Sequence, residues 1–532
     1  MKTKFIFITG GVVSSLGKGI IAASLARLLL SRGYKVNIQK FDPYINIDPG
    51  TLNPYEHGEC YVTIDGKETD LDLGHYERFT DILTTEANNV TTGKVYKAVI
   101  ERERRGDYLG KTVQIIPHIT DELKRSMKHL GEKGNFDFII TEIGGTVGDI
   151  ESTPFLEAVR QLRWEMGSDA INIHLTYVPY LLAAKELKTK PTQHSVKQLQ
   201  QLGIQPDVLV LRAEREIPEA MMRKVAQFCN VRPDAVVQCV DVPTIYEVPI
   251  RMHSQKLDET VLSLLGFTQY KNIDLSGWEN FLESMRNADR IIRIGLVGKY
   301  VELPDAYKSI QESLIQAATY CGYRLDLDFI NSENITAGNV RETLYGHEGI
   351  IIAPGFGSRG IEGKIITLEW CRENDIPTFG ICLGMQCMVI EFARNVLGLQ
   401  DANTAEIDPD SSHKVIDLME SQKNITEMGG TMRLGAYSCR LEADSIAGEA
   451  YGKLMIYERH RHRFEFNEDY REQFEKEGMK CVGINPDTNL VEVVEIPGKK
   501  WFLGTQFHPE YQSTVLHPHP LFLSFIKAAT SD

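Results

Sequence analysis

The sequence predicts two doubly wound α/β domains, and three observations support this prediction. Short apolar runs typical of buried parallel strands recur along the chain, and helix-like patterns separate them. The runs fall into two series, the second of which begins near residue 291. A chain of 532 residues is also too long to fold around one hydrophobic core. We therefore expect one domain over 1–266, a linker over 267–290 and a second domain over 291–532.

The N-terminal domain begins with an apolar run that leads straight into a Gly-rich loop containing a lysine. We interpret this run as the first buried strand rather than as a secretory signal. Four further runs have the length and composition of strands, and two intervening segments have helical patterns. The predicted strands cover 5–9, 136–141, 170–175, 208–211 and 235–240, and the predicted helices cover 20–31 and 154–166.

The C-terminal series predicts a second sheet of the same kind. Between the two series, 267–290 has weak periodicity and many polar residues, as expected of a linker. A further polar stretch over 401–430 predicts a loop-rich insertion. The strands of this sheet are expected at 291–297, 323–330, 349–353, 376–381, 490–496 and 501–507.

The bulk composition excludes several classes of function. A net charge of −15 argues against nonspecific nucleic-acid binding, although it leaves room for a local basic pocket that holds phosphates. No run of 18 apolar residues occurs, so no membrane span is expected. Nine cysteines without a close-set framework suit a reducing compartment. We therefore expect a cytoplasmic protein without nucleic-acid or membrane partners.

The Gly-rich loop from Gly10 to Gly19 is typical of a phosphate site. Backbone N–H groups of such a turn and of the following helix N-terminus hold phosphate oxygens, and Lys18 adds a positive charge. The strict pattern has four residues between its glycines and then Lys-Ser/Thr. Here five residues separate Gly11 from Gly17, and Gly19 stands where the hydroxyl is expected. The side chain that usually contacts magnesium is therefore missing.

A magnesium site at this loop would need carboxylates from elsewhere in the chain. Glu142 ends a predicted strand, where the ligands of parallel sheets gather, and Asp72 lies in a polar loop. A second polar segment, 188–193, places two cations and three polar side chains beside a helix-stopping proline. The alternatives are a glycine turn without a ligand, ordinary surface carboxylates and, for 188–193, a solvated helix end.

The segment 380–384 is typical of a thiol nucleophile on a sharp turn. A buried strand ends, Cys382 follows between flanking glycines, and a helix begins at once. The positive end of that helix favours the thiolate. A base and an orienting acid are required, and an extended backbone puts His508 and Glu510 on one side. The stretch 353–357 follows another strand and offers backbone N–H groups to an oxyanion.

Two alternatives remain for this thiol. Cys382 alone could be a small buried residue in a turn, but three pieces that each follow a strand disfavour this interpretation. The other alternative is a thiol variant of the α/β-hydrolase fold, which expects its acid between the nucleophile and the histidine. In this chain the acid beside His508 comes two residues after it.

At these residues the chain resembles the CTP synthase family along essentially its full length. The segments responsible are 10–19, 71–79, 142–151 and 188–193, and the C-terminal segments 380–386 and 508–510 resemble class I glutamine amidotransferases. The resemblance implies an N-terminal P-loop-like synthetase (amidoligase) domain and a C-terminal class I glutaminase domain. ATP would phosphorylate O4 of UTP, and ammonia freed from glutamine through a thioester at Cys382 would displace the phosphate to give CTP.

The resemblance also implies roles for individual residues. The glutaminase triad would be Cys382, His508 and Glu510. ATP would be held by Ser15, Leu16, Gly17, Lys18, Gly19, Ile20, Asp72 and Val242, with Mg²⁺ on Asp72 and Glu142. The UTP or CTP site would comprise Ser14, Asp149, Ile150, Glu151, Lys188, Thr189, Lys190, Pro191, Thr192, Gln193 and Lys224. Glutamine would contact Gly355, Leu383, Gly384, Met385, Gln386, Glu406 and Arg463.

Arg463 lies in the basic stretch 459–465. A solvated basic strand is the plain interpretation of this stretch, and a bidentate guanidinium for the α-carboxylate of glutamine is the more specific one. The family further implies GTP as an allosteric activator, CTP as a feedback inhibitor and a homotetramer. Arg359 and the segment 299–304 resemble the lid tied to GTP activation.

Three positions depart from the family pattern. The oxyanion segment 353–357 reads Ala-Pro-Gly-Phe-Gly where Pro-Gly-Gly-Phe-Gly is usual, but Gly355 is retained and function is expected to survive. Val240 stands where many members have lysine, which weakens an adenine contact at that position. Cys60 stands where valine is common in a segment, 57–60, that resembles an ammonia-tunnel gate, and its alternative is plain packing.

Two other functions are alternatives to this one. The first is another ATP-dependent glutamine amidotransferase, of the cobyrinate amidase kind, which would act on a carboxylate instead of a uracil base. The second is non-enzymatic: a deviant phosphate-loop switch or a filament-forming scaffold. A switch would have no need of Cys382, His508 and Glu510.

Overall fold

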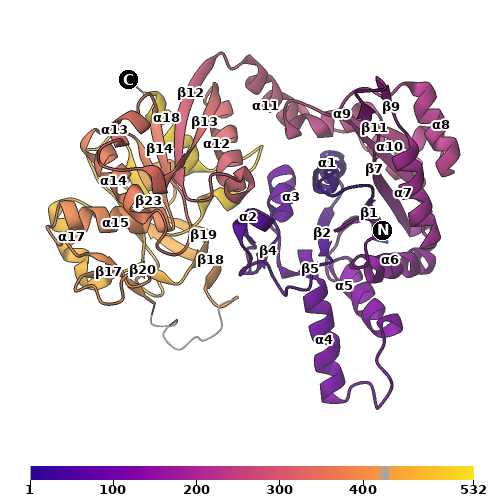
Figure 1. Cartoon of the computed structure of the whole chain (residues 1–532), viewed down its shortest axis with the longest axis horizontal. Helices are drawn as coiled ribbons and strands as arrows, with labels where there is room; N and C mark the ends of the chain where they lie inside the picture. The colour runs from indigo at the N-terminus through magenta and orange to yellow at the C-terminus, as the bar shows by residue number, and fades with distance from the viewer. Residues whose placement is uncertain (1, 420–421, 423–429, 532) are drawn as a thin grey trace. The chain divides into compact units, whose positions relative to one another are not determined.

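The computed structural model describes residues 2–419, 422 and 430–531, which form two compact units (Figure 1). The first unit comprises Met1–Asp48 and Asp72–Gly277, and the second comprises Pro49–Leu71 and Trp278–Asp532. The second unit therefore includes a segment from the N-terminal part of the chain, drawn in indigo around α2 and β4. The boundaries at 266 and 291 stay a prediction.

The first unit contains a seven-stranded sheet in which every pairing is parallel. The strand order is β11-β10-β7-β1-β6-β2-β5. The chain leaves β1 towards β2 on one side and later crosses to β7 on the other, so a topological switch lies beside β1. The strands are β1 (Lys4–Gly10), β2 (Val36–Asp42), β5 (Asn89–Thr91), β6 (Phe138–Ile143), β7 (Ala170–Tyr177), β10 (Val208–Ala213) and β11 (Val236–Val240).

The five strands predicted for this unit are confirmed, whereas β2 and β5 were missed. The strand β2 reads Val-Asn-Ile-Gln-Lys-Phe-Asp, which lacks a continuous apolar run although all seven residues are buried. Its polar side chains find partners inside the unit: Gln39 Nε2 donates to Thr141 Oγ1 over 2.7 Å, and Asn88 Nδ2 donates to Asn37 Oδ1 over 2.6 Å. A polar strand can be buried in this way because its hydrogen bonds are satisfied.

Helices alternate with these strands, as the doubly wound prediction requires. The helix α1 follows β1 and is buried on nearly all sides, with Ala and Leu packed against α3 and α9. The helices are α1 (Lys18–Ser31), α3 (Asp72–Thr80), α4 (Thr92–Arg105), α5 (Thr120–Lys133), α6 (Thr153–Met166), α7 (Lys190–Gln201), α8 (Glu219–Cys229), α9 (Val248–Ser254) and α10 (Leu257–Leu264). A short hairpin of β8 (Tyr180–Leu181) and β9 (Glu186–Leu187) precedes α7.

The second unit contains a nine-stranded mixed sheet with the order β13-β12-β14-β15-β23-β22-β21-β18-β19. The first five strands in this order pair in parallel, and the pairings from β23 through β19 are antiparallel. The parallel strands are β12 (Arg290–Gly298), β13 (Tyr323–Asn331), β14 (Gly349–Ile352), β15 (Thr378–Ile381) and β23 (Phe502–Thr505). The antiparallel strands are β22 (Val491–Glu495), β21 (Lys480–Ile484), β18 (Arg433–Leu441) and β19 (Met455–His462).

All six strands predicted for this unit are confirmed, and the antiparallel strands β18, β19 and β21 were not predicted. The strand β18 alternates between buried and more exposed residues, and β19 carries arginine and histidine side chains that only the folded unit buries. The stretch 401–430 was predicted as loop. It contains the short strands β16 (Asn403–Thr404) and β17 (Lys414–Leu418), while 420–421 and 423–429 lie outside the described residues.

Short strands and helices complete the unit. A hairpin of β3 (Tyr61–Val62) and β4 (Glu68–Thr69) comes from the N-terminal segment, and β20 (Phe464–Phe466) pairs with β17. The helices are α2 (Pro54–His57), α11 (Ser276–Asn287), α12 (Lys308–Tyr320), α13 (Val340–Thr343), α14 (Ile361–Glu373), α15 (Leu383–Asn395), α16 (Ile446–Tyr451), α17 (Arg471–Glu477) and α18 (Pro520–Thr530). Among the described residues no helix is long and apolar enough to cross a membrane.

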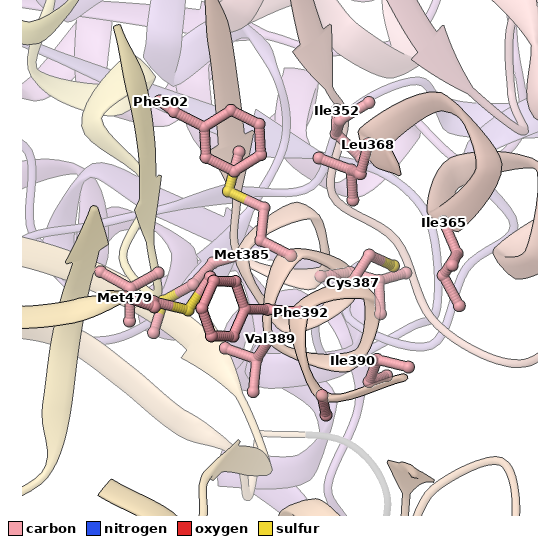
Figure 2. Packing of buried hydrophobic residues seen from close by; sticks show 14 of the residues in the cluster. Ile352, Ile365, Leu368, Met385, Cys387, Val389, Ile390, Phe392, Met479 and Phe502 are labelled. Atoms are coloured by element: carbon pink, nitrogen blue, oxygen red, sulfur yellow. The ribbon is translucent and has the colours of Figure 1, made fainter. Parts of the chain in front are cut away.

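The helix α15 lies at the centre of one hydrophobic cluster. Figure 2 shows its side chains, among them Met385, Val389 and Phe392, together with Phe502 of β23 and Met479. These side chains are almost completely buried. Removing one large side chain from such a cluster costs about 2–5 kcal/mol, because a cavity replaces its contacts. The first residue of α15 is therefore held in a fixed position, directly after Cys382.

Candidate functional site

The turn at Cys382 has the backbone of a strained nucleophile. Cys382 lies between β15 and α15 with φ 53° and ψ −105°, a conformation that side-chain-bearing residues rarely adopt. A Cβ at Gly384 would lie 2.2 Å from the carbonyl oxygen of Ile352, so only glycine lets α15 approach β14 this closely. The predicted sharp turn between a strand and a helix at Cys382 is confirmed, and the role of the thiol as a nucleophile stays a prediction.

His508 and Glu510 meet beside this turn. His508 Nδ1 lies 2.7 Å from Glu510 Oε1, and both side chains are buried. The ring of Tyr511 stacks on the imidazole at a centroid distance of 5.0 Å. Burial acts to lower the pKa of His508, but the Glu510 carboxylate and the Cys382 thiol outweigh it and raise this pKa to about 10. The imidazole is thus an oriented base whose charged form is strongly stabilised.

The thiol and the imidazole come together because β15 and β23 are parallel neighbours. Ile381 is in register with Thr505, and Cys382 N donates to Thr505 O over 2.7 Å. Both strands therefore end at the same edge of the sheet. Gln506 Nε2 lies 3.6 Å from Cys382 Sγ. His508 Nε2 is buried and lacks a hydrogen bond of standard geometry among the described residues, so it is available to the sulfur and to a substrate.

The strand β19 supports both catalytic candidates through its backbone. His508 N donates to Arg459 O over 2.8 Å, and Cys382 Sγ lies 3.8 Å from Arg461 O. Arg459 and His460 are completely buried, so a solvated strand is the wrong interpretation for this part of 459–465. Sequence reasoning gave β19 no such role. The only signal was the unusual density of arginine and histidine in this stretch.

Two of the proposed glutamine residues, Glu406 and Gln386, make hydrogen bonds to neighbouring backbone groups. Gly357 N donates to Glu406 Oε1 over 2.8 Å, and Gln386 Nε2 donates to Phe464 O over 2.9 Å. Leu383 and Gly384 begin α15, whose Cys382 cap makes no side-chain hydrogen bond, so the first-turn N–H groups have no side-chain cap.

Arg463 lies just after β19, with its guanidinium between neutral acceptors. Its Nη1 donates to Gln422 Oε1 over 2.7 Å, and its Nη2 donates to Thr431 Oγ1 over 2.6 Å. The forked geometry suits a carboxylate, and these two acceptors among the described residues are neutral oxygens. A bidentate role in glutamine binding therefore stays a prediction.

A cavity of about 480 Å³ opens onto the thiol site within the second unit. Cys382, His508 and Gly355 line it together with His57 and Cys60 of the N-terminal segment. Tyr61 and Tyr511 anchor that segment, since Tyr61 Oη donates to Tyr511 O over 2.9 Å. The structure thus brings the residues that resemble a tunnel gate to the same cavity as the thiol.

The phosphate loop lies between β1 and α1 in the first unit. Val12, Ser15 and Gly17 adopt φ values of 82°, 58° and 89°, which turn the backbone tightly before α1. Lys18 Nζ donates to Gly145 O over 2.9 Å. Burial lowers the pKa of Lys18 and the nearby Glu142 raises it, with the net result below its ordinary value. The loop therefore presents a poorly solvated cation beside uncapped backbone N–H groups.

The surroundings of Gly19 leave no space for the hydroxyl side chain that the strict phosphate-loop pattern has at this position. A Cβ at this position would lie 2.4 Å from Asp72 Oδ1 and 3.4 Å from Glu142 Oε2. The place of the absent side chain is therefore filled by the two carboxylates that were predicted as metal ligands. Lys40 Nζ contacts Asp72, and Tyr76 Oη donates to Glu142.

The electrostatics of these carboxylates fit a site for a divalent cation. Burial and the charge of Asp72 raise the pKa of Glu142 to about 7. Burial acts to raise the pKa of Asp72, but Lys40 and His75 lower it to about 2. Mg²⁺ commonly binds one or two carboxylates together with substrate phosphates. Among the described residues no group of three or more His, Cys, Asp or Glu side chains forms a complete metal site, so phosphate oxygens would have to complete this one.

Sequence reasoning missed Lys40 and Tyr76. Tyr76 had a signal, because it lies one helical turn after Asp72 inside the segment 71–79. Lys40 had none, because its strand β2 was not predicted.

Two parts of the predicted pyrimidine site lie against the phosphate loop. Val147 N donates to Gly10 O over 2.8 Å, which places the loop before α6 beside it. A Cβ at Gly11 would lie 1.7 Å from Ser195 Oγ, which places α7 beside it as well. The residues concerned are Asp149, Ile150 and Glu151 in the loop before α6, Lys188 and Thr189 just before α7, and Lys190, Pro191, Thr192 and Gln193 in its first turn.

Two other predicted residues, Lys224 and Val242, lie on elements for which no contact with the phosphate loop is seen among the described residues. Lys224 lies exposed on α8, which packs against α7. Val242 lines a cavity of about 310 Å³ at the end of β11, whose lining residues come from 216–255. Val240 and Arg251 line the same cavity.

Comparison with known proteins identifies relatives of the whole chain. A family model described as "CTP synthase N-terminus" matches residues 4–267, and one described as "Glutamine amidotransferase class-I" matches residues 302–528. The CTP synthase of Bacteroides fragilis is 66% identical over 528 residues, which cover 99% of both chains. The CTP synthase of Porphyromonas gingivalis is 65% identical over 527 residues, covering 99% of this chain and 98% of that one.

Among solved structures, the glutaminase domain of Trypanosoma brucei CTPS with bound acivicin is similar to the C-terminal part. It is 39% identical, and the match covers 45% of this chain and 93% of that chain with a TM-score of 0.43.

Proposed function

The chain belongs to the CTP synthase family and converts UTP to CTP in a glutamine-dependent, ATP-driven reaction, and we propose how its two sites divide this chemistry. The thiol site releases ammonia from glutamine, and the phosphate-loop site activates UTP. The observation that supports this division most strongly is the oriented pair of His508 and Glu510 beside a strained Cys382. The full-length relatives exclude the cobyrinate-type and non-enzymatic alternatives.

At the thiol site, Cys382 attacks the side-chain amide carbon of glutamine. His508 accepts the thiol proton through Nε2 and donates it to the departing nitrogen, so that ammonia leaves and a glutamyl thioester remains. Water then attacks the thioester with His508 again as the base, which releases glutamate and restores the thiol. Glu510 orients the imidazole and stabilises its charged form.

The remaining thiol-site residues bind the substrate and its oxyanion. Backbone N–H groups of Gly355 and Leu383 stabilise the tetrahedral oxyanion, because they are preorganised at a strand end and a helix N-terminus. Glu406 and Arg463 bind the α-ammonium and α-carboxylate of glutamine. Gly384, Met385 and Gln386 form the wall of the pocket.

At the phosphate-loop site, the backbone from Ser15 to Ile20 and the Lys18 ammonium hold the phosphates of ATP. Asp72 and Glu142 would hold Mg²⁺ together with phosphate oxygens, and the bound ion would supply positive charge for phosphoryl transfer. Val242 contacts the adenine from the cavity at the end of β11.

UTP binds beside the same loop, where ATP phosphorylates its O4 and ammonia then displaces phosphate at C4. Ser14, the loop 149–151, the start of α7 at 188–193, and Lys224 form this site. Their mixture of hydroxyl, carboxylate and lysine side chains suits a ribonucleotide triphosphate. Ammonia passes His57 and Cys60 on its way from the thiol.

The proposed function also includes regulation by nucleotides and assembly into a tetramer. GTP activates through Arg359 and the segment 299–304, CTP inhibits at the UTP site, and the protein acts as a homotetramer in the cytoplasm. The net charge of −15 supports small-molecule rather than nucleic-acid partners.

A product assay tests the division of labour. CTP formation is measured with UTP, ATP and Mg²⁺ and with either glutamine or ammonium as the nitrogen source. Cys382→Ala should abolish glutamine-dependent synthesis and keep ammonium-dependent synthesis within about twofold of the wild type, since it removes only the nucleophile. Loss of both activities in a folded variant would contradict the two-site assignment.

A further inference from the structure

A buried lysine lies beneath the segment 353–357, and so far it has been counted only as the first residue of the GTP-linked segment 299–304. Lys299 follows β12 directly and is 1% exposed. Its Nζ donates to Phe356 O, and it also donates to Gly357 O over 3.1 Å. Burying an ammonium group is costly unless it is paired, so its retention here calls for an explanation.

The same peptide unit is held from its other side by an acid. Gly357 N donates to Glu406 Oε1 over 2.8 Å. In a trans peptide the carbonyl of Phe356 and the N–H of Gly357 point in opposite directions. A cation therefore holds one end of this peptide and an anion holds the other. Charge-assisted hydrogen bonds of this kind are about twice as strong as neutral ones.

The stem of Lys299 also restricts the residue that precedes this peptide. A Cβ at Gly355 would lie 3.0 Å from Lys299 Cε, and Gly355 has a φ of 155°. At the start of the segment, Lys364 Nζ donates to Ala353 O over 2.6 Å. Buried lysines thus hold backbone carbonyls at both ends of the segment.

We propose that Lys299 is a positioning residue for glutamine hydrolysis: with Glu406 it clamps the Phe356–Gly357 peptide and so fixes the oxyanion donor at Gly355. The inference rests on the proposed function of the thiol site, because it presumes that Gly355 N–H receives the oxyanion. Lys299 itself touches neither the thiol nor the substrate. Glu406 has a double role, since its carboxylate also faces the α-ammonium of glutamine.

The charges around Lys299 agree with a positioning role, because its ammonium form is held in place at an electrostatic cost. Burial, Lys364 on α14 and Arg359 lower the pKa of Lys299, and Glu406 and Cys387 on α15 act to raise it, which leaves the pKa at about 8. Tyrosines also surround it: its Nζ lies 5.7 Å from the Tyr300 ring, its carbonyl accepts from Tyr55 Oη over 2.8 Å, and its backbone N–H donates to Tyr307 Oη over 3.1 Å. A lysine buried at this cost in free energy is better explained by function than by stability.

The test compares Lys299→Met with the wild type in the full-length protein. Glutaminase kcat should fall about tenfold or more, because small misplacements of catalytic groups have effects of this size. The KM for glutamine should change by less than about threefold, and ammonium-dependent CTP synthesis should be retained. Lys480→Met is the matched control, since the exposed Lys480 also donates to a backbone carbonyl, that of Glu475, over 2.8 Å.

A double-mutant cycle separates the clamp from a general structural effect. Lys299→Met and Glu406→Gln act on one peptide, so their effects on kcat should be clearly less than multiplicative when combined. Lys299→Arg keeps the charge and should retain more kcat than Lys299→Met. If Lys299→Met does not fold, Lys299→Gln, which keeps two N–H donors, replaces it in the cycle.

Three results would overturn the proposal: multiplicative effects in the cycle, equal kcat for the Arg and Met variants, or an equal loss of ammonium-dependent synthesis. Failure of the proposed function looks different. In that case the wild-type protein would lack glutaminase activity that Cys382→Ala removes, whatever Lys299 does.

Discussion

The phosphate loop and the thiol turn use the same backbone arrangement for different chemistry. Each follows a buried parallel strand and precedes a buried helix. The helix caps are Gly17, with φ 89°, and Cys382, with φ 53°, and neither cap makes a side-chain hydrogen bond. Both turns therefore leave first-turn N–H groups open to a negative oxygen.

The difference between the two turns lies in what the neighbouring elements supply. At the phosphate loop, β6 and α3 contribute Glu142 and Asp72, so a cation with phosphates is favoured. At the thiol turn, β23 leads to His508 and Glu510, so proton transfer is favoured. The turn itself favours anions in general, and residues distant in sequence decide which reaction follows.

The largest expected effect is that of Lys18→Ala on both nitrogen sources. CTP synthesis should fall at least about 100-fold with glutamine and with ammonium, because charge stabilisation at the phosphates precedes either route. Initial rates with each nitrogen source measure this effect, and Lys124→Ala at a surface ion pair serves as the control. Wild-type turnover in Lys18→Ala would remove the lysine from the mechanism.

Glu510→Gln should impair the thiol turn and leave the phosphate loop active. Glutamine hydrolysis is expected to fall about 100-fold or more, because the imidazole loses its orienting charge, whereas ammonium-dependent synthesis should persist. Glutamate release and CTP formation are measured in parallel, with the exposed Glu472→Gln as the matched control. An unchanged hydrolysis rate would show that Glu510 is not part of the catalytic group.

Gly19→Ala and Gly384→Ala probe the space at each turn. Gly19→Ala should impair synthesis with both nitrogen sources by about tenfold, because its Cβ displaces Asp72. Gly384→Ala should impair only the glutamine-dependent reaction to a similar degree, because its Cβ meets the Ile352 carbonyl. Gly338→Ala, where a Cβ has room, is the control. If the two variants lose the same activities, the division between the turns is wrong.

The smallest expected effect is on folding stability and comes from Glu465, which follows β19 and the thiol-site residue Arg463. Glu465 is buried and its Oε2 lacks a partner among the described residues. Burial raises the pKa of this carboxyl to about 8, above the unfolded value of about 4.5. The folded state therefore binds the proton more tightly, and the stability from this group is lost as pH rises from about 4.5 to about 8.

Glu465→Gln removes this dependence. The variant should unfold a few degrees above the wild type at pH 8 to 9, by roughly 2–4 °C for each kcal/mol regained, with a smaller difference at pH 5. Thermal unfolding at the two pH values measures the change. If the wild type gained stability relative to Glu465→Gln as the pH rises, the pKa of Glu465 would not be raised in the folded state.

The parallel halves of both sheets could be predicted because such strands are buried on both faces. Continuous apolar runs at β1, β6 and β14 have few other interpretations in a chain of this length. The strands β2, β18 and β19 could not be found in this way. Their polar residues are buried against partners far along the chain, as Asn37 is against Asn88.

The sequence by itself determined the two turns, because glycine spacing and the order of strand and helix are local properties of the backbone. It also indicated Cys382, His508 and Glu510 through their positions at strand ends. Only the tertiary structure decided that Asp72 fills the space at Gly19, that β19 holds the thiol and the base, and that Lys299 and Glu406 share one peptide. Such contacts depend on hydrogen bonds and charges paired across long sequence separations, which no local pattern encodes.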